Sequence, residues 1–329
     1  MWLDPARNYD LIGDVHGCAQ SLERLLELLG YKKRAGVWQH PYRQAVFLGD
    51  LIDRGPQIRE TLHIVHAMVD AGYAYCIMGN HEYYALAWDT PIEQDGKQTH
   101  VREHNTHHAR LQRETLEQFA HHPYDWHDFN QWFLSLPLFI DAQRFRAVHA
   151  CWDERLINAL RKRFPDGRID TEFVRQSAVS GSFADQTFNR LLRGVNLPLP
   201  YGMSQIGQDG YQRSSFRSKF WHEEQSILTY GDVVFQPDAL PEHIAQKPLP
   251  EQYLRQISGY DEQQPLLFVG HYWRQGQPNL IRPNLACLDY SAVSGGKLVA
   301  YRLGQEDRLL PSNFVWVNAL EQGKDNEVE

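Results

Sequence analysis

The feature that most constrains the fold of this chain is a series of short polar clusters, each preceded by an apolar run. Three of them are framed by glycine and lie near the N-terminus, at residues 13–17 (GDVHG), 49–55 (GDLIDRG) and 79–82 (GNHE). Two shorter ones, at residues 148–150 (VHA) and 270–271 (GH), follow much later. Glycine allows the tight turns and close backbone approach that such clusters need. The pattern indicates polar side chains gathered at the ends of several strands.

The segments between the first three clusters alternate between strand and helix patterns. Short apolar runs at residues 9–12, 45–48 and 73–78 predict strands. Two sets of apolar residues recur at helical spacing: Leu22, Leu25, Leu26 and Leu29, then Ile58, Leu62, Val65 and Val69. Gly30 is placed to cap the first helix, and Pro56 is predicted to open the second. The fold class is therefore α/β, with the clusters at the carboxyl ends of strands, where open α/β sheets bind ligands.

Further strands are predicted in the second half of the chain. They cover residues 145–148, 266–269, 285–288 and 297–303. We expect the last two to pair as a hairpin through residues 289–296.

Two segments interrupt the α/β pattern. Residues 89–131 are polar and rich in histidine, and residues 151–262 form a long insertion between the fourth and fifth clusters. His104 and His108 have the i, i+4 spacing of an accessory metal site, but no carboxylate or cysteine completes the set, so a solvated helical excursion is favoured. Residues 143–222 carry 13 Lys and Arg against 7 Asp and Glu, a local positive excess.

Composition limits the classes of protein that remain. A chain of 329 residues with 42% hydrophobic content can build a substantial core, and the net charge of −8 argues against binding of extended nucleic acid. No apolar run approaches the roughly 20 residues that span a membrane, and the N-terminus lacks the pattern of a signal peptide. We predict a soluble, cytoplasmic protein with one domain over residues 1–318 and a polar, frayed tail over 319–329.

The four cysteines are scattered and form no CxxC pair. Cys76 and Cys287 lie in apolar runs, which indicates buried free thiols. Cys18 and Arg24 have the spacing found in cysteine-dependent phosphatases. That chemistry needs a loop of backbone amides around the phosphate, whereas residues 20–23 are predicted to begin an amphipathic helix, so a cysteine nucleophile is disfavoured.

The clusters together contribute two Asp, one Asn and three His side chains, enough to hold two neighbouring divalent ions. Carboxylate and amide oxygens suit Mn²⁺ or Fe²⁺, and imidazoles widen the choice to Zn²⁺ and Ni²⁺. Two ions about 4 Å apart stabilise both the attacking and the leaving oxygen of a displacement at phosphorus. The residue types therefore point to phosphoryl chemistry.

The order of the clusters resembles that of the calcineurin-like metallophosphoesterases, and in particular the branch of phosphoprotein phosphatases and symmetrical diadenosine tetraphosphatases. The resemblance spans residues 9–303 and rests on GDxHG, GDxxDRG, GNHE, a His before a small residue and a late GH. It implies a β-sandwich of two mixed sheets flanked by helices, with helical insertions. It also implies a hydrolase that uses a dinuclear metal-activated hydroxide on a phosphoprotein, a dinucleoside polyphosphate or a nucleic-acid end.

The resemblance implies a role for each cluster residue at the metal centre. The first ion would take Asp14, His16 and Asp50. The second would take Asp50, Asn80, His149 and His271. Asp50 is the candidate for the bridging ligand because a carboxylate has two oxygens. Manganese is the expected metal, with Fe, Zn, Ni and Co as alternatives.

The remaining cluster residues are implied to act on the substrate. His81 would protonate the leaving oxygen, with Asp53 fixing its tautomer, and Arg54 would hold phosphate oxygens with its planar fork. Arg193, in an Arg-Gly dipeptide, is the candidate for a second phosphate-binding arginine. Two other arginines compete for that role, Arg213 and Arg217.

The alternative function is a catalytically inactive binding module of the same fold. A decayed member should lose a ligand or the acid first, but all of these residues are present: Asp14, Asp50, Asp53, Asn80 and His81.

Overall fold

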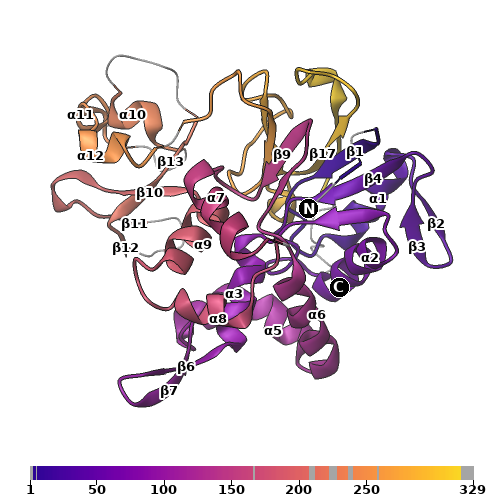
Figure 1. The fold of residues 1–329 in the computed structure, drawn as a ribbon, viewed down its shortest axis with the longest axis horizontal. Helices are drawn as coiled ribbons and strands as arrows, with labels where there is room; N and C mark the ends of the chain where they lie inside the picture. Colours follow the sequence, from indigo (N-terminus) through magenta and orange to yellow (C-terminus); the bar gives the residue numbers. More distant parts are fainter. Residues whose placement is uncertain are drawn as a thin grey trace, which may run out of the picture.

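The computed structural model describes residues 3–4, 6–165, 167–206, 212–221, 228–235, 240–257 and 259–319 (Figure 1). Most strands of the described chain belong to two mixed sheets, one of six strands and one of four. The other strand pairs are hairpins or small additions, such as β2 (Lys32–Arg34) with β3 (Val37–Gln39).

The first sheet carries the three N-terminal clusters. Its strands are, in order, β16 (Asp289–Tyr290), β17 (Lys297–Leu303), β1 (Asn8–Ile12), β4 (Arg43–Phe47) and β5 (Ala74–Cys76), with β18 (Phe314–Asn318) also paired to β17. Strands β1, β4 and β5 are parallel, so their carboxyl ends reach the same edge. The strand predictions near residues 9–12, 45–48 and 73–78 are confirmed, with ends shifted by one or two residues.

The second sheet carries the two late clusters. Its order is β15 (Leu285–Cys287), β14 (Leu266–Val269), β9 (Phe145–Val148) and β8 (Phe139–Asp141). Strand β14 is parallel to both β9 and β15, and β8 is antiparallel to β9. His149 and His271 follow the ends of β9 and β14.

The predicted hairpin between residues 285–288 and 297–303 is wrong. Strand β15 pairs with β14 in the second sheet, and the chain then crosses to the first sheet, where β16 forms the hairpin with β17. The crossing occurs at Leu288, whose backbone N–H still bonds Val269 O at 2.8 Å. An apolar run that is buried on both faces fits a parallel strand as well as a hairpin strand, and its partner is a non-local choice.

The two sheets pack face to face around one layer of buried side chains. Phe268 of the second sheet lies 5.2 Å from Tyr301 of the first, and Phe145 lies 5.5 Å from Tyr9, measured between ring centroids. Helices α1 (Ala19–Leu28) and α2 (Ile58–Asp70) cover the other face of the first sheet. The structure therefore confirms the α/β sandwich of two mixed sheets flanked by helices.

The start of α2 differs from the prediction. The helix begins at Ile58, with Gln57 as N-cap, so Pro56 lies outside it. The N–H of Gln57 bonds Gly17 O at 2.9 Å, which ties this loop to the first cluster and delays the helix. Gly30 follows α1 with φ of +89°, as its predicted capping role requires.

The histidine-rich segment 89–131 begins as a hairpin and continues as helices. After α3 (Asn80–Asp89) come β6 (Pro91–Gln94), β7 (Lys97–His100), α4 (Thr106–Leu111), α5 (Arg113–Phe119) and α6 (Pro123–Ser135). The His104 ring stacks on Trp88 at 3.8 Å and on His100 at 4.0 Å. Among the described residues, neither His104 nor His108 belongs to a group of ligand atoms that could hold a metal.

The second insertion forms a layer of short elements beside α3, on the left in Figure 1. The Phe188 ring stacks on Tyr83 of α3 at 4.1 Å. The elements of the second insertion are α7 (Glu154–Arg163), α8 (Thr171–Gln176), α9 (Phe183–Arg193), β10 (Val195–Pro198), β11 (Gln205–Ile206), β12 (Gln212–Arg213), β13 (Ser215–Ser218), α10 (Tyr230–Val233), α11 (Glu242–Ala245) and α12 (Glu251–Leu254). Short 3₁₀ turns lie at η1 (Pro200–Gly202), η2 (Ala292–Ser294) and η3 (Pro311–Asn313).

No helix in these described ranges combines the length and the apolar character that a membrane span requires. The single domain over residues 1–318 stays a prediction. The predicted polar tail, 319–329, lies outside the described residues apart from Ala319.

Candidate active site

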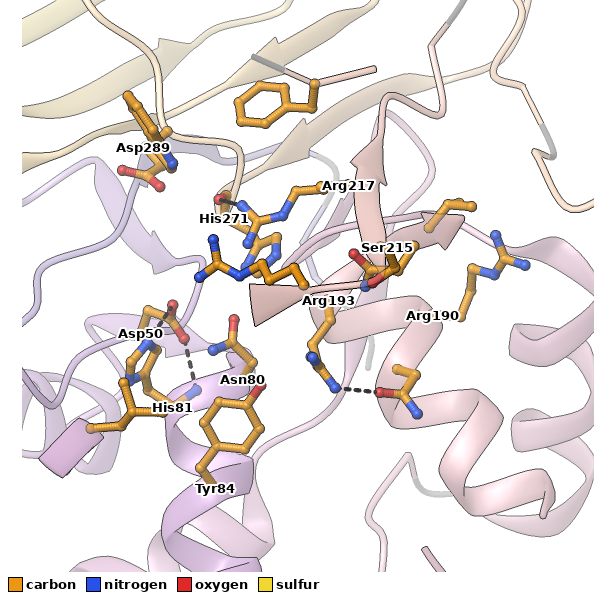
Figure 2. A pocket seen from close by; sticks show the side chains of 18 of the residues that line it. Asp50, Asn80, His81, Tyr84, Arg190, Arg193, Ser215, Arg217, His271 and Asp289 are labelled. Carbon is orange, nitrogen blue, oxygen red and sulfur yellow. Dashed lines mark hydrogen bonds and ion pairs between the residues drawn. The ribbon is translucent and has the colours of Figure 1, made fainter. Parts of the chain in front are cut away.

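Four of the five clusters line one open cavity of about 1300 Å³. Figure 2 shows Asp50, Asn80 and His81 on one side, with Arg193 and Arg190 across from them. His149 lies beneath the cavity wall and is fully buried. The site is thus assembled from strand ends of both sheets, together with α9 and β13 of the second insertion.

Backbone conformation at the clusters is unusual for residues with side chains. His16, Asp50, Asp53, Arg54 and His271 all have φ between 44° and 68°. Such left-handed residues cost about 1–3 kcal/mol each and persist only where surrounding contacts enforce them. The strain is concentrated where the chain must turn polar side chains toward the cavity.

Glycine is required at Gly79 and Gly270 by close approach. A Cβ on Gly79 would lie 2.3 Å from Asp50 Oδ1, and one on Gly270 would lie 2.1 Å from Asp14 Oδ1. Any side chain at either position would displace a carboxylate of the site.

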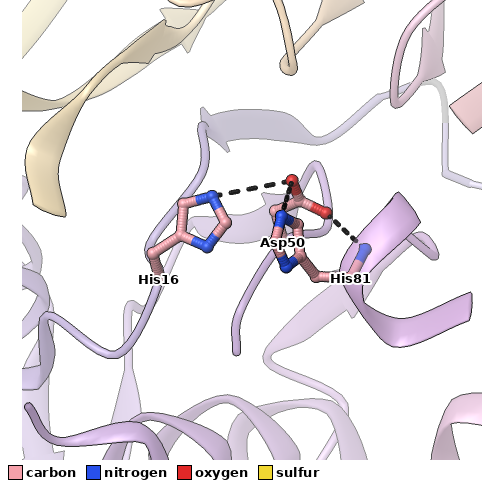
Figure 3. Close-up of side chains that lie close together, drawn as sticks. All are labelled: His16, Asp50 and His81. Atoms are coloured by element: carbon pink, nitrogen blue, oxygen red, sulfur yellow. Dashed lines mark hydrogen bonds and ion pairs between the residues drawn. The ribbon is translucent and has the colours of Figure 1, made fainter. Parts of the chain in front are cut away.

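Asp50 lies at the centre of two groups of possible metal ligands. Its Oδ2 is 3.6 Å from His16 Nε2 and 3.9 Å from His81 Nε2 (Figure 3). The same oxygen is 3.3 Å from His149 Nε2. The ligand atoms of His16, Asp50 and His81 all lie within 4.8 Å of one another, as do those of Asp50, His149 and His271. Asp50 therefore belongs to both groups, and its role as a bridging ligand stays a prediction.

The far nitrogen of two of these histidines is held by backbone. His16 Nδ1 lies 2.7 Å from Ile52 O, and His149 Nδ1 lies 2.7 Å from Leu48 O. These contacts place a proton on Nδ1, so Nε2 is the nitrogen that faces Asp50. Metal-binding histidines are typically oriented by such a hydrogen bond from the nitrogen that does not bind the metal.

The Asn80 amide lies beside the second group of possible ligands. Its Oδ1 lies 3.2 Å from His149 Nε2, and the same end of the amide lies 2.8 Å from His271 Nδ1 and 3.2 Å from Leu192 O. Turned by 180°, the amide would donate its N–H groups to these three acceptors. His271 Nε2 is buried without a hydrogen-bond partner in the described chain. A divalent ion at the second group would take the Asn80 oxygen as a ligand together with Asp50, His149 and His271.

Asp14 lines the cavity but lies in neither group of ligand atoms. Its Oδ2 instead accepts the backbone N–H of His271 at 3.1 Å. Burial, and then the nearby Asp289 carboxylate, raise the pKa of Asp14 well above its usual value. Added positive charge would relieve both effects, so Asp14 fits a place beside a metal ion and stays a predicted ligand.

Asp50 and His149 stabilise each other in their charged forms. Burial opposes ionisation of Asp50, but the surrounding histidines, His149 first, hold its pKa well below the usual range. Burial also opposes the charged form of His149, and the Asp50 carboxylate overcomes it, raising the pKa of His149 to about 10. A proton on His149 thus occupies the place that a metal cation would take.

His81 and Asp53 form a buried pair beside the metal ligands. His81 Nδ1 lies 2.6 Å from Asp53 Oδ2, which leaves Nε2 directed at the cavity. The backbone N–H of His81 donates to Asp50 Oδ1 at 3.0 Å, so the ring is also tied to the metal-ligand group. The arrangement is the one expected of a histidine that exchanges a proton with substrate.

All four predicted arginines line the cavity, but they are held differently. Arg54 is exposed beside the clusters. Arg193 Nη1 donates to Asn189 Oδ1 at 2.8 Å, and Arg217 Nη1 donates to His271 O at 3.2 Å. Arg213, from the short strand β12, is exposed. Three lining arginines were not predicted: Arg110, Arg155 and Arg190.

Glycine is required at position 194 by its backbone conformation and by a close contact. Gly194 ends α9 with φ of +75°, and a Cβ there would lie 2.1 Å from the hydroxyl of Tyr272. Tyr272 follows His271 and is fully buried. The dipeptide therefore lets α9 approach the fifth cluster and places Arg193 in the cavity.

Two buried acidic residues of the site were not predicted from the sequence. Glu82, the last residue of GNHE, accepts the backbone N–H groups of Gly79, Asp50 and Leu51 at 2.7–2.9 Å, so it joins the second and third clusters. Its position within the GNHE motif was the sequence feature that could have identified it as a site residue. Asp289 lines the cavity from the crossing between the sheets, a position that depended on the strand pairing.

The cysteine-nucleophile mechanism has no support in the structure. Cys18 precedes α1, which begins at Ala19 as a regular helix, and burial raises the pKa of the thiol to about 11. The thiol is therefore protonated at neutral pH. Cys76 and Cys287 are buried free thiols, as predicted.

Comparison with known proteins agrees with the geometry. Residues 8–168 match the family model of calcineurin-like phosphoesterases. An asymmetrical bis(5'-nucleosyl)-tetraphosphatase from Oceanobacillus iheyensis is 32% identical over 180 residues, 53% of this chain and 66% of that relative. Another from Halalkalibacterium halodurans is 46% identical over 74 residues, 22% of this chain and 30% of the relative. The chain thus spans about two thirds of the first relative's length and less than a third of the second's.

A solved structure supports the same fold. A protein serine/threonine phosphatase from Saccharomyces cerevisiae superposes with a TM-score of 0.50 at 15% identity, over 97% of this chain and 82% of that one. The match to the family model and the relatives' sequences show that the chain belongs to the calcineurin-like phosphoesterase family.

Proposed function

We propose that this protein is a metal-dependent phosphoric ester hydrolase with two divalent ions in its catalytic centre. The observation that carries the proposal is the convergence on Asp50 Oδ2 of three imidazole Nε2 atoms, at 3.3, 3.6 and 3.9 Å. When bound, the ions would supply a nucleophile and positive charge at the reacting phosphate. Asp50 would contact both, with Asp14 and His16 at the first ion. The second would take Asn80, His149 and His271. Manganese is the metal proposed, because oxygen ligands are mixed with nitrogen ligands.

The chain's own residues would move the proton and hold the phosphate. His81 Nε2 would donate a proton to the leaving oxygen, while Asp53 holds Nδ1 and stabilises the charged ring. Arg54 would contact the reacting phosphate, and Arg193, farther along the cavity, would contact a more distant anionic group of the substrate.

A small polyanionic substrate of the dinucleoside polyphosphate type fits the cavity best. Its volume of about 1300 Å³ exceeds the roughly 300–1,000 Å³ of common ligand pockets. Seven arginines line it against five acidic side chains, two of which are proposed metal ligands. The names of the relatives point the same way. Phosphoproteins and nucleic-acid ends are the other substrates to test, and a cytoplasmic location stays a prediction.

An activity assay tests the proposal directly. Purified protein should hydrolyse p-nitrophenyl phosphate with Mn²⁺, lose activity in a chelator, and recover it when Mn²⁺ is restored. A panel of diadenosine tetraphosphate, phosphopeptides and RNA with terminal phosphates should then show preference for the first. If protein loaded with each candidate metal hydrolyses none of these, the inactive binding module is the better description.

A further inference from the structure

The carboxylate that orients His81 is itself held from the histidine-rich insertion. Asp53 is fully buried, and its Oδ2 contacts His81. Its other oxygen, Oδ1, accepts a short hydrogen bond from the hydroxyl of Thr115 in α5. The Thr115 Oγ1 also accepts the backbone N–H of Asp53 at 3.1 Å. One hydroxyl therefore fixes both the carboxylate and the backbone of this residue.

A second side chain of α5 holds the other end of the same loop. Gln118 Nε2 donates to Gly55 O at 2.9 Å, and its Oε1 accepts the backbone N–H of Ile58 at 2.7 Å. Thr115 and Gln118 are three residues apart, so they lie on one face of the helix. That face contacts the backbone from residue 53, in the second cluster, to residue 58, where α2 begins.

The loop that α5 contacts would not be expected to hold its shape alone. Asp53 and Arg54 are consecutive residues with φ of 65° and 68°, and neither is glycine. Two adjacent left-handed residues require contacts that over-determine the backbone. Within the loop, one such contact is the 2.8 Å bond from Gly55 N to Asp53 O. From outside the loop, Thr115 and Gln118 contribute four hydrogen bonds, beside the one from Gln57 N to Gly17 O.

We propose that α5 is a positioning element for the proton-donating pair, with Thr115 as a positioning residue that acts through Asp53 on His81. This inference rests on the proposed function. A carboxylate held at both oxygens cannot rotate away from His81 Nδ1, so the ring keeps its tautomer and its Nε2 stays directed at the leaving oxygen. Without the Thr115 hydroxyl, Oδ1 of Asp53 would lose its side-chain donor inside the core, and the carboxylate would be free to turn.

The alternative is that Thr115 only fills space, since α5 also packs against α2 and α6. A space-filling role and a positioning role make different kinetic predictions. Poor packing would lower stability and affect every substrate alike. Loss of positioning would affect only those substrates whose leaving group needs a proton.

The test compares two aryl phosphates of similar shape that differ in that need. Phenolate is a poor leaving group without protonation, whereas p-nitrophenolate leaves as the anion. Thr115→Val keeps the side-chain shape and removes the hydroxyl, and Thr115→Ser keeps the hydroxyl. Thr61→Val is the matched control, because Thr61 is also fully buried and its hydroxyl has no hydrogen-bond partner among the described residues.

We expect Thr115→Val to lower kcat on phenyl phosphate about 10- to 100-fold, by analogy with the loss of a group that orients a metal-binding histidine. Its kcat on p-nitrophenyl phosphate should match that of Thr61→Val, KM should change little on either substrate, and Thr115→Ser should restore most of the loss. If Thr115→Val does not fold, Thr115→Ala, which also lacks the hydroxyl, should show the same selective loss.

Equal losses on both aryl phosphates in the folded variants, or no loss, would overturn the positioning role. Wild-type protein that hydrolyses neither substrate with any metal would instead overturn the proposed function. The two failures are therefore distinguishable.

Discussion

Replacing Asp50 with asparagine should separate metal binding from folding. Asp50 is almost fully buried, and its Oδ2 lies within 4 Å of three imidazoles. Asparagine has nearly the same shape but no negative charge, and it cannot bridge two cations as an anion. The change therefore removes the group on which both proposed ions depend, while the strand ends that carry the other ligands stay in place.

The size of the effect on stability follows from linkage. A metal present at 100 times its Kd stabilises the folded state by about 2.7 kcal/mol. At about 2 °C per kcal/mol for a large domain, this corresponds to a rise in Tm of about 5 °C. Asp50→Asn should abolish this metal-dependent rise. In metal-free protein the loss should stay below the roughly 3–5 kcal/mol of breaking a buried ion pair, because His149 can release its proton.

The assay is thermal unfolding with and without Mn²⁺, together with metal content and turnover of p-nitrophenyl phosphate. Asp70→Asn, on the exposed end of α2, is the matched control and should behave like wild type. We expect the Asp50 variant to lose bound metal, the Mn²⁺-dependent Tm shift and turnover together. Retained turnover, or an undiminished Tm shift with Mn²⁺, would refute the two-metal assignment.

Four further substitutions test the other parts of the site. His81→Ala should slow hydrolysis of phenyl or alkyl phosphates by about 10²–10⁴-fold and of p-nitrophenyl phosphate far less; equal losses would indicate a role in ordering the metals. Arg54→Ala should impair every substrate by about 1.5–3 kcal/mol of transition-state binding. By contrast, Arg193→Ala should raise KM for diadenosine tetraphosphate and spare aryl phosphates; wild-type kinetics on both would make Arg193 a surface residue. Gly194→Ala should lower Tm, because its methyl would overlap the Tyr272 hydroxyl, and an unchanged melting curve would contradict that contact.

The sequence by itself determined the parts of this protein that depend on local chemistry. Glycine-framed clusters after apolar runs predicted where strands end and where polar side chains gather, and helical spacing predicted the buried face of α1. Those inferences hold because a turn or a helix face is specified by residues a few positions apart. The candidate metal ligands could be named because they stand in these clusters, whereas their assignment to two ions came from the resemblance to a known family.

Tertiary structure decided everything that depends on partners distant in the sequence. The pairing of β15 with β14, the entry of Asp289 into the cavity and the contact of Thr115 with Asp53 all join segments that no local pattern connects. An apolar strand offers the same backbone hydrogen bonds to any neighbour, and an arginine on a short strand gives no sign of the surface it will face. Tertiary packing of the two sheets and the insertions therefore decides which sheet each strand joins. It also decides which arginines line the proposed phosphate site.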